Sequence, residues 1–324
     1  MDFLKNIDFG ELFGKLKDLL GKVDWGDLLK KIKPVLSKVG DFLKKTPSMF
    51  MALVLFLTVA VDPAAGNTDT SLLVHEDILT LLDASYAGQG LTNDGKYYYT
   101  SGAISFAKYT ALAKYEIDTM KQVKKKVFPV DWDLIKKGYD HIGGISYYDG
   151  KLYAGMESTD NKALPCIAVF NADSLEYETS FELPRTWFPD GSVAWVAVNP
   201  QTGLLYCCAW DHAQTLHEFK IDATMAHVRE IDITGLSELD RIQGGEFYQG
   251  VLYLSADRKD SKIKEVLAVD VETGAAKVAF TRDCGKADSE AEDITVFQAK
   301  DGSLFHVADY NKLLSVYIRS YIAL

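Results

Sequence analysis

Three glutamates, Glu157, Glu246 and Glu292, stand where a recurring strand pattern begins or ends. Carboxyl groups that are crowded together raise one another's pKa, so one member of such a group can serve as a general acid. We therefore predict these three residues as catalytic candidates.

Polar and aromatic side chains at equivalent places predict a ligand-binding site. The set consists of Gln89, Asn93, His141, Trp195, Trp210, Asp211, Gln243, Asp257 and Asp309. Carboxylates, amides, imidazole and indoles together suit a cation or a small polar ligand with an amine or hydroxyl groups. The alternative is that these side chains only hydrogen-bond strand ends to water in a polar channel.

Other kinds of chemistry lack their sequence motifs. The chain contains no phosphate-binding Gly-rich loop ahead of a helix, no Gly-x-Ser-x-Gly and no His-Glu-x-x-His. Four cysteines without metal-site spacing predict ordinary burial. Four histidines lie on strand patterns, where a structural role is more common than a catalytic one: His75, His217, His227 and His306.

A repeated turn motif indicates the elements that position these residues. It consists of a polar or acidic residue, a glycine, any residue, a bulky residue and an aromatic one. Its glycines are 47 to 55 residues apart: Gly95, Gly150, Gly203, Gly250 and Gly302. Each motif lies between two short apolar strand patterns, which predicts a hairpin turn.

A second repeat has the same period. Alternating strand patterns end in acidic turns 49 to 55 residues apart, at Asp118, Asp173, Asp222 and Glu272. A period near fifty with about four strands per unit is typical of propeller blades. We predict an all-β fold, a five-bladed β-propeller over residues 67–324, with a sixth degenerate blade as the alternative.

The last unit lacks an outer strand. Residues 72–82 have a strand pattern and are predicted to pair with this unit, which closes the ring and removes exposed sheet edges. In such a ring the start of each inner strand and the end of the next strand share one face. The predicted site residues would therefore converge on the mouth of the central channel, across from the glycine turns.

The composition limits the class of protein. The 324 residues carry a formal charge of −11, with 48% apolar and 12% aromatic residues, as in folded globular proteins. These values exclude a disordered or collagen-like chain. The acidic balance argues against nucleic acid as a partner, because binding to phosphates requires clustered Lys and Arg.

Residues 1–46 differ from the rest, since they carry a charge of +3 and have leucines at helical spacing opposite lysines. They predict short amphipathic helices that lie on an anionic membrane, self-assemble or bind a partner helix. A helical cap packed on the main domain is the alternative.

Residues 47–66 contain thirteen consecutive uncharged residues, 49–61, preceded by Lys44 and Lys45. This length is typical of a signal-type core and short for a spanning helix. We predict a signal-anchor-like segment, attachment to a membrane through residues 1–61, and an extracytoplasmic location, anchored or secreted. The alternative is a buried core element.

The first repeat resembles a known family. Residues 89–102, followed by Leu112-Ala113-Lys114-Tyr115, are similar to the first blade of plant and bacterial glutamine cyclotransferases, which are five-bladed propellers. The ends Cys208-Ala209-Trp210 and Ser255-Ala256-Asp257 are also similar to blade ends of that family. The resemblance implies cyclisation of an N-terminal glutamine to pyroglutamate with loss of ammonia, with a channel carboxylate shuttling the proton.

One position departs from this family. Its second blade opens with a Phe-Gly-Glu-Gly type of motif, where this chain has His141-Ile142-Gly143-Gly144, so that Gly143 replaces the acid. The resemblance then implies that Glu157, Glu246 or Glu292 would supply the carboxylate. A looser resemblance, to lactonase-type propellers, implies calcium held by Glu292, Glu246 and Asn93.

Two functions from different classes remain open. One is a membrane-attached propeller that binds a small polar or cationic ligand, a peptide N-terminus or a protein partner. The other is a cyclotransferase or calcium-dependent hydrolase acting in the channel. The absence of the family's second-blade glutamate favours the binding role slightly.

Overall fold

A computed structural model describes residues 73–79, 85–104, 109–160, 162–189, 191–258, 261–284, 289–311 and 315–322. All of them belong to the unit Ala65–Leu324. The predictions for residues 1–46 and 47–66 fall outside the described residues. No helix in the described part of the chain is both long and apolar enough to cross a lipid bilayer.

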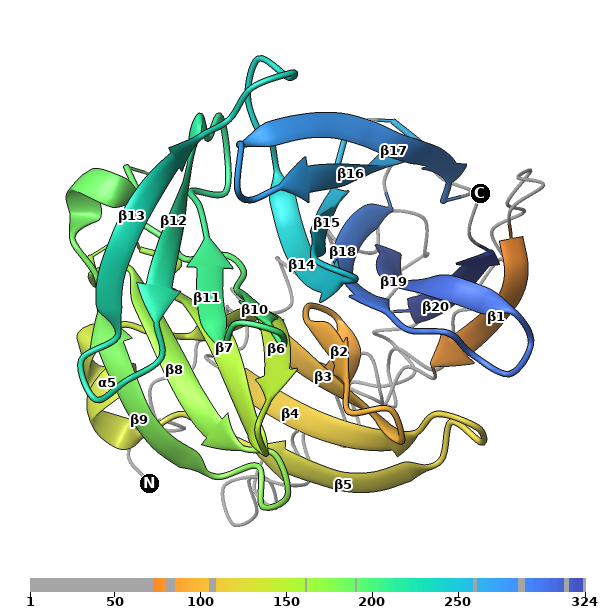
Figure 1. Ribbon diagram of the computed structural model, residues 1–324. Helices are drawn as coiled ribbons and strands as arrows, with labels where there is room; N and C mark the ends of the chain where they lie inside the picture. Colours follow the sequence, from red (N-terminus) through yellow and green to blue (C-terminus); the bar gives the residue numbers. More distant parts are fainter. Residues whose placement is uncertain are drawn as a thin grey trace, which may run out of the picture. The chain divides into compact units, whose positions relative to one another are not determined.

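Five four-stranded antiparallel sheets surround a common centre, which confirms the predicted five-bladed propeller (Figure 1). Blade 1 comprises β2 (Leu91–Asn93), β3 (Tyr97–Ile104), β4 (Tyr109–Glu116) and β5 (Gln122–Val127). Blade 2 comprises β6 (His141–Tyr148), β7 (Lys151–Glu157), β8 (Cys166–Asn171) and β9 (Tyr177–Glu182). Blade 3 comprises β10 (Ala197–Asn199), β11 (Leu204–Cys207), β12 (Thr215–Lys220) and β13 (Ala226–Asp232).

Blade 4 comprises β14 (Ile242–Tyr248), β15 (Val251–Ala256), β16 (Ile263–Asp270) and β17 (Ala275–Asp283). Blade 5 comprises β18 (Glu290–Val296), β19 (Ser303–Asn311), β20 (Ser315–Ile322) and, as its outer strand, β1 (Leu73–Leu79). Two short helices join blades, α5 (Trp132–Lys137) before β6 and η3 (Arg185–Trp187) before β10.

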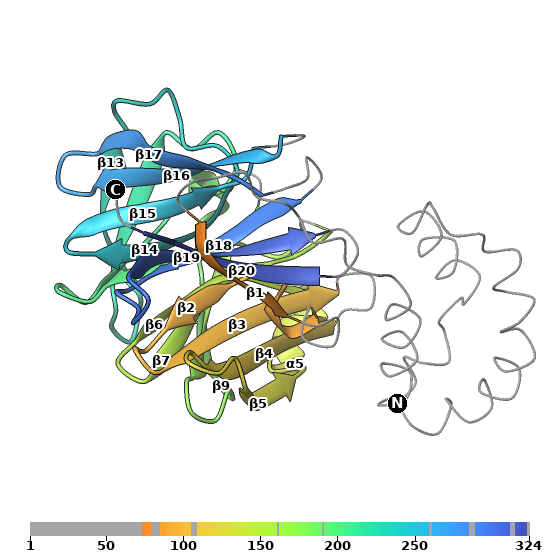
Figure 2. The same ribbon diagram turned by 90° about the vertical axis from the view of Figure 1, so that its right-hand side faces the viewer.

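The ring closes where β1 pairs with β20, with Asp77 opposite Ile318. Figure 2 shows these two strands, from opposite ends of the described chain, side by side. One sheet therefore contains strands from both ends, and ring closure depends on their pairing.

The five repeated glycines form the turns between the first and second strands of the blades. Their φ angles lie between 69° and 92°, a region that L-residues with side chains rarely adopt. A Cβ atom at Gly150 would meet nothing within 4 Å, so the glycine is required there by backbone conformation and not by space. This local requirement explains why the repeat is visible in the sequence.

The aromatic residue of the repeat packs between blades. Tyr206 of blade 3 contacts Phe247 of blade 4, and Tyr253 of blade 4 contacts Phe305 of blade 5, each with ring centroids 5.0 Å apart. Large aromatic rings bury much apolar area, and such pairs add about 0.5–1.5 kcal/mol each. The four cysteines are buried, and they form no disulfide with one another.

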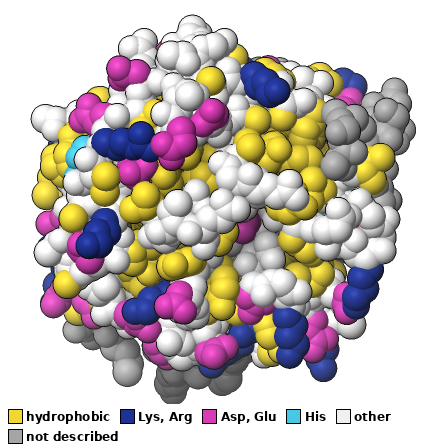
Figure 3. Space-filling model, in the orientation of Figure 1, with side chains coloured by type: hydrophobic (Ala, Val, Ile, Leu, Met, Phe, Trp, Pro, Cys, Tyr) yellow, Lys and Arg dark blue, Asp and Glu magenta, His cyan; other side chains and the backbone are white. Residues whose placement is uncertain are grey.

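The surface seen along the ring axis is mixed in character. In Figure 3, acidic and basic side chains are scattered among apolar ones, and the Lys and Arg side chains do not gather in one area of this face.

Candidate functional site

The strand registers define the end of the channel at which the mouth lies. His141, the first residue of β6, pairs with Glu157 at the end of β7. Ile242 at the start of β14 pairs with Ala256, and Glu290 at the start of β18 pairs with Tyr310. These pairs lie at the opposite end of the strands from the glycine turns, and we call this end the mouth.

Gln89, His141 and Glu157 form one side of the mouth. His141 Nε2 lies 2.6 Å from Gln89 Oε1 and 3.6 Å from Glu157 Oε1. Because an amide oxygen only accepts hydrogen bonds, Nε2 carries the proton. The Gln89 carbonyl accepts a hydrogen bond from the Asp293 backbone N–H at 3.3 Å, so this group adjoins Glu292.

Trp210 and Gln243 form another side, between blades 3 and 4. The Trp210 indole N–H donates to Gln243 Oε1 at 3.0 Å. The Arg241 guanidinium lies 4.4 Å from the centroid of the Trp210 ring, a cation–π arrangement. The side chains of Trp210 and Gln243 are therefore held in fixed orientations.

Glu292 is the most unusual group of the mouth. Its side chain is buried, with 2% exposure, and Oε1 has no hydrogen-bond partner among the described residues. Burial raises the pKa of Glu292 well above its usual range, and nearby carboxylates add to the effect. These carboxylates are Glu290, Asp257, Glu157 and Asp309. Burial and these neighbouring carboxylates therefore favour the protonated form of Glu292.

Glu246 and Asn93 lie elsewhere. Glu246 pairs with Tyr253 and Asn93 with Tyr98, each three residues after a turn glycine. Ile242 lies at the mouth, and Glu246 is four residues further along β14. Four residues of a strand span about 13 Å, so Glu246 lies about that far from the mouth. The prediction that Glu246 shares the mouth with Glu157 is therefore wrong, because the strand extends far enough to separate them.

A chain of hydrogen bonds joins this second group across three blades. Asn93 Nδ2 donates to Thr295 Oγ1 at 2.7 Å, and the Thr295 hydroxyl donates to Glu246 Oε2. Burial raises the pKa of Glu246 to about 8, a rise that the Thr295 hydrogen bond opposes and the nearby Asp293 increases. Neither of the two groups of potential metal ligands found among the described residues contains Glu246 or Glu292. The calcium site stays a prediction.

Asp293 lies between the two groups and was not among the predicted site residues. Its carboxylate accepts the backbone N–H groups of Leu91 at 3.0 Å and Ile145 at 2.9 Å, on the inner strands of blades 1 and 2. It accepts its neighbour Ile294 N–H at 2.8 Å, and a Cβ atom at Gly244 would lie 1.7 Å from its Oδ1. The Asp293 carboxylate thus holds several inner strands close together, and the channel is constricted at Asp293.

The sequence contained one signal for this constriction. The inner strands of blades 2 and 4 carry the pairs Gly143-Gly144 and Gly244-Gly245. A glycine inside a strand often marks close approach of another backbone. The glycine pairs indicate that another group lies close to these inner strands, but they do not identify Asp293 as that group.

Asp257 is bound by cations of the chain itself. It lies 2.5 Å from Lys264 Nζ and 2.7 Å from Arg241, and it also accepts the Ala291 N–H at 3.1 Å. Its observed contacts tie blades 4 and 5 together. A ligand-binding role for Asp257 stays a prediction.

Asp309 has a similar environment. It pairs with Arg282 at 2.6 Å and Arg319 at 2.5 Å, and the three side chains are at most 1% exposed. Burial alone would raise its pKa, but the two guanidinium groups hold the pKa below its usual value. Asp309 therefore remains ionised inside blade 5, where its observed contacts are structural.

Trp195 is fully buried in the core near the hub. Its side chain packs beneath Gly144 and Gly245, at positions where a Cβ atom would lie 2.8 Å and 3.3 Å away. Contact between Trp195 and a ligand stays a prediction.

Asp211 belongs to a cluster beside the mouth. Its Oδ2 lies 3.7 Å from His212 Nε2, and His212 Nδ1 lies 2.9 Å from Glu238 Oε1. A hydrogen bond with Asp240 and partial burial raise the pKa of Asp211. The cluster is acidic and partly exposed, and the structure places it in the loops that follow β11 and precede β14.

No model of a protein family matches this chain, and neither does any curated protein. Among solved structures, the glutaminyl cyclase of Myxococcus xanthus is similar with a TM-score of 0.53 and 14% identity, covering 76% of this chain and 94% of that one. The β-xylosidase RS223 is similar with a TM-score of 0.50 and 12% identity, covering 76% and 94%. The resemblance to glutamine cyclotransferases is confirmed for the fold, which this chain shares as a five-bladed β-propeller.

Proposed function

We propose that the mouth of the channel binds a small polar ligand through a protonated amine, such as the N-terminus of a peptide. The observation that carries this proposal is Oε1 of Glu292, a buried acceptor without a hydrogen-bond partner among the described residues. A buried polar atom of this kind costs about 1–3 kcal/mol until a partner arrives. A ligand that donates to it recovers that free energy.

The charges around Glu292 favour a cationic donor. Glu157 and Glu290 raise its pKa, which means that their negative charge is felt at Glu292. The nearby cations Arg241 and Lys264 are engaged by Asp257. An ammonium group would therefore meet acceptors and a negative potential together.

The polar and aromatic walls suit the rest of such a ligand. Gln89 and Gln243 offer amide groups, and the Trp210 ring is held by Arg241 and Gln243. Fixed amide groups provide orientation, and an indole face provides apolar contact.

Calorimetric titration with a Gln-Ala-Ala peptide tests this proposal. We expect the free peptide to bind and its N-acetylated form not to bind. Glu157→Gln should weaken binding by about 10- to 100-fold, because a hydrogen bond to a charged group contributes about 1.5–3 kcal/mol. Glu178→Gln is a matched control. Glu178 lies on β9, the outer strand of the same blade, and pairs there with Lys151 of β7.

Equal binding of the acetylated peptide, or wild-type affinity in both Glu157→Gln and Glu292→Gln, would contradict an amine site at the mouth. Failure of both peptides and of simple primary amines to bind would also overturn it.

A specific contact supports a second candidate, cyclisation of an N-terminal glutamine. A Cβ atom at Gly143 would lie 2.1 Å from the Ala194 carbonyl oxygen, so no side chain fits there. The same point lies 3.2 Å from Glu157 Oε1. Glu157 thus presents its carboxylate beside the position at which the cyclotransferase resemblance expects an acid.

In this reaction the nitrogen of an α-amino group in its neutral form attacks the carbon of the side-chain amide. A new C–N bond forms, the bond to the amide nitrogen breaks, and ammonia leaves. The carboxylate form of Glu157 would accept the proton of the attacking amine, while the protonated form of Glu292, which burial favours, would donate a proton to the departing nitrogen. An assay for ammonia release from the same peptide tests this candidate, and binding without turnover leaves only the first proposal.

We also propose that residues 1–61 attach the propeller to the extracytoplasmic side of a membrane. The support is the charge of +3 in residues 1–46 and the uncharged stretch 49–61. Protease treatment of intact cells and of opened membranes tests this proposal, because a propeller on the extracytoplasmic side is cleaved in both. Cross-linking of a chain without residues 1–46 tests self-assembly or partner binding through that segment.

A further inference from the structure

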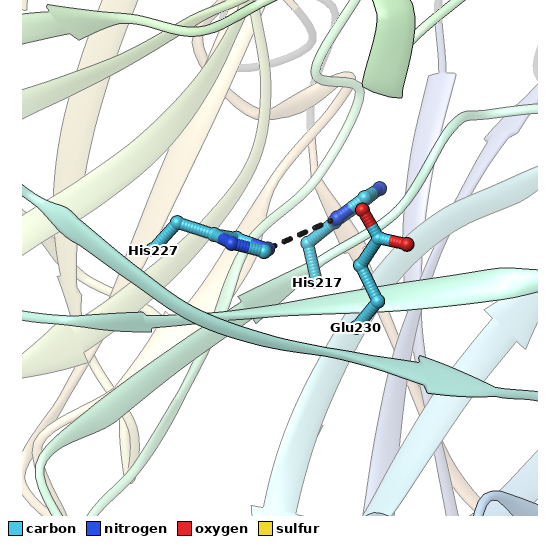
Figure 4. Close-up of side chains that lie close together, drawn as sticks. All are labelled: His217, His227 and Glu230. Atoms are coloured by element: carbon cyan, nitrogen blue, oxygen red, sulfur yellow. Dashed lines mark hydrogen bonds between the residues drawn. The ribbon is translucent and has the colours of Figure 1, made fainter.

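His217, His227 and Glu230 bring three potential metal ligands together on the outer half of blade 3. His217 lies on β12, while His227 and Glu230 lie on β13 (Figure 4). Their nearest nitrogen and oxygen atoms all lie within 4.8 Å of one another. This group is on the outer strands of the blade, away from the residues of the mouth.

A strand irregularity creates the group. Side chains alternate between faces of a strand, so residues 227 and 230 would point to opposite faces of a regular β13. Here His227 pairs with Phe219 and Glu230 with His217, because the register shifts between Glu218 and Phe219. The bulge therefore turns both β13 side chains to the face of His217, and bulges commonly re-aim side chains in this way.

The two imidazoles have the separation that a shared metal ion requires. His217 Nδ1 and His227 Nε2 are 3.4 Å apart. Figure 4 marks this contact as a hydrogen bond, and its length lies beyond the usual 2.7–3.2 Å range, so the bond is weak. Two nitrogens that each lie about 2.0–2.1 Å from a tetrahedral zinc ion are about 3.3–3.4 Å apart.

Trp187 of η3 holds the two rings in place. Its ring stacks on His227 with centroids 4.2 Å apart and on His217 at 5.2 Å. The Trp187 backbone is also a hydrogen-bond partner of His217. A ligating histidine usually makes such a bond through its second nitrogen, which fixes the ring orientation.

Exposure differs among the three groups in a way that suits an ion from solution. His217 is buried, whereas Glu230 is exposed. The site is therefore anchored on one side and open on the other, which provides an entry path and a fourth position for water.

We propose that His217 Nδ1, His227 Nε2 and the Glu230 carboxylate bind one divalent transition-metal ion, with zinc as the best chemical match. Two imidazoles and one carboxylate are a set of ligands that zinc accepts, and its tetrahedral preference fits the nitrogen separation. The ion would link β12 to β13 and thereby stabilise the outer half of blade 3.

Zinc binding to the metal-free full chain tests the proposal directly. We expect one equivalent of zinc to bind in competition with a chromophoric chelator, and cobalt to give the visible absorption of a tetrahedral site. Glu230→Gln should weaken binding by at least about tenfold and His227→Gln by on the order of 100-fold. Because Glu230 is exposed, its replacement should leave the fold intact by circular dichroism.

His212→Gln is the matched control, since His212 belongs to the other cluster, with Asp211 and Asp240. We expect this variant to bind zinc as the wild type does. Copper should also quench Trp187 fluorescence in the wild type, and Trp187→Phe should remove that part of the quenching. Absence of zinc and cobalt binding, wild-type affinity in Glu230→Gln and His227→Gln, or loss of binding in His212→Gln would each overturn the proposal.

Discussion

Replacement of Asp309 by asparagine should destabilise the propeller strongly. Asp309 accepts charged hydrogen bonds from Arg282 of blade 4 and Arg319 of blade 5, at 2.6 Å and 2.5 Å. All three side chains are at most 1% exposed. Asparagine has almost the same shape as aspartate but no charge, so Asp309→Asn would leave two buried guanidinium groups without their counter-ion.

The magnitude follows from the burial of this triad. Removal of one partner from a buried ion pair typically costs about 3–5 kcal/mol, because the remaining charge has lost its compensation. For a domain of about 250 residues, 1 kcal/mol corresponds to a shift in Tm of about 2–4 °C. Asp309→Asn should therefore lower the Tm by about 6–20 °C.

Thermal unfolding followed by circular dichroism at pH 7 measures this effect. Asp118→Asn is the control, because Asp118 pairs with Lys300 on the surface, where both side chains are largely exposed. Such a pair contributes little, so the control should move the Tm by less than about 2 °C.

The same triad has a pH dependence with a definite sign. The pKa of Asp309 is lower in the folded protein than in the unfolded chain, so its contribution is complete above the unfolded value, about 3.9. The contribution is lost as the pH falls through the folded pKa. If Asp309→Asn and the wild type melt within about 2 °C of each other at pH 7, the reasoning about this triad is refuted.

Three further predictions concern the channel and the turns. The Glu246 pKa of about 8 lies above its unfolded value, so stability should fall as the pH rises from about 4.5 to about 8, and Glu246→Gln should flatten this part of the Tm profile; an unchanged profile contradicts the assignment. Gly150→Ala should lower the Tm by about 2–4 °C, because φ is 75° while no atom lies near the new methyl group, and a neutral effect would show that the turn relaxes without cost. Gly244→Ala should be much more damaging, since its Cβ atom would lie 1.7 Å from Asp293 Oδ1, and a variant that melts like the wild type would show that the hub is not close-packed.

The blade count and the turns could be predicted because their causes are local. A φ of 85° at Gly95 or 92° at Gly302 strongly favours glycine whatever surrounds it, and each turn repeats that preference. The aromatic residue of the motif also recurs, since every blade must fill the same space against its neighbour, as Tyr206 does against Phe247. The regular spacing of these residue types therefore indicates the repeated blades of the ring.

The candidate site could be predicted only in part. His141 and Glu157 meet because strand ends that face each other across a hairpin are determined by the turn between them. The length of β14 and the shifted register of β18 decide where Glu246 and Glu292 lie, and neither can be read from the spacing of glycines. The bulge that gathers His217, His227 and Glu230 is likewise invisible in the alternation of residues.

The amino-acid sequence by itself determined the repeated sheets, their turns and the acidic character of the mouth, since these follow from each residue's own conformational and chemical preferences. Only the tertiary structure decided which of the carboxyl groups pair with Lys or Arg side chains of the chain itself. Asp257 and Asp309 look like Glu292 in the sequence, but Lys264, Arg282 and Arg319 pair with the first two. Among the described residues no ion pair involves Glu292, and burial raises its pKa. The free energy of a buried charge depends on what lies within a few ångströms of it, and that is a property of the assembled ring.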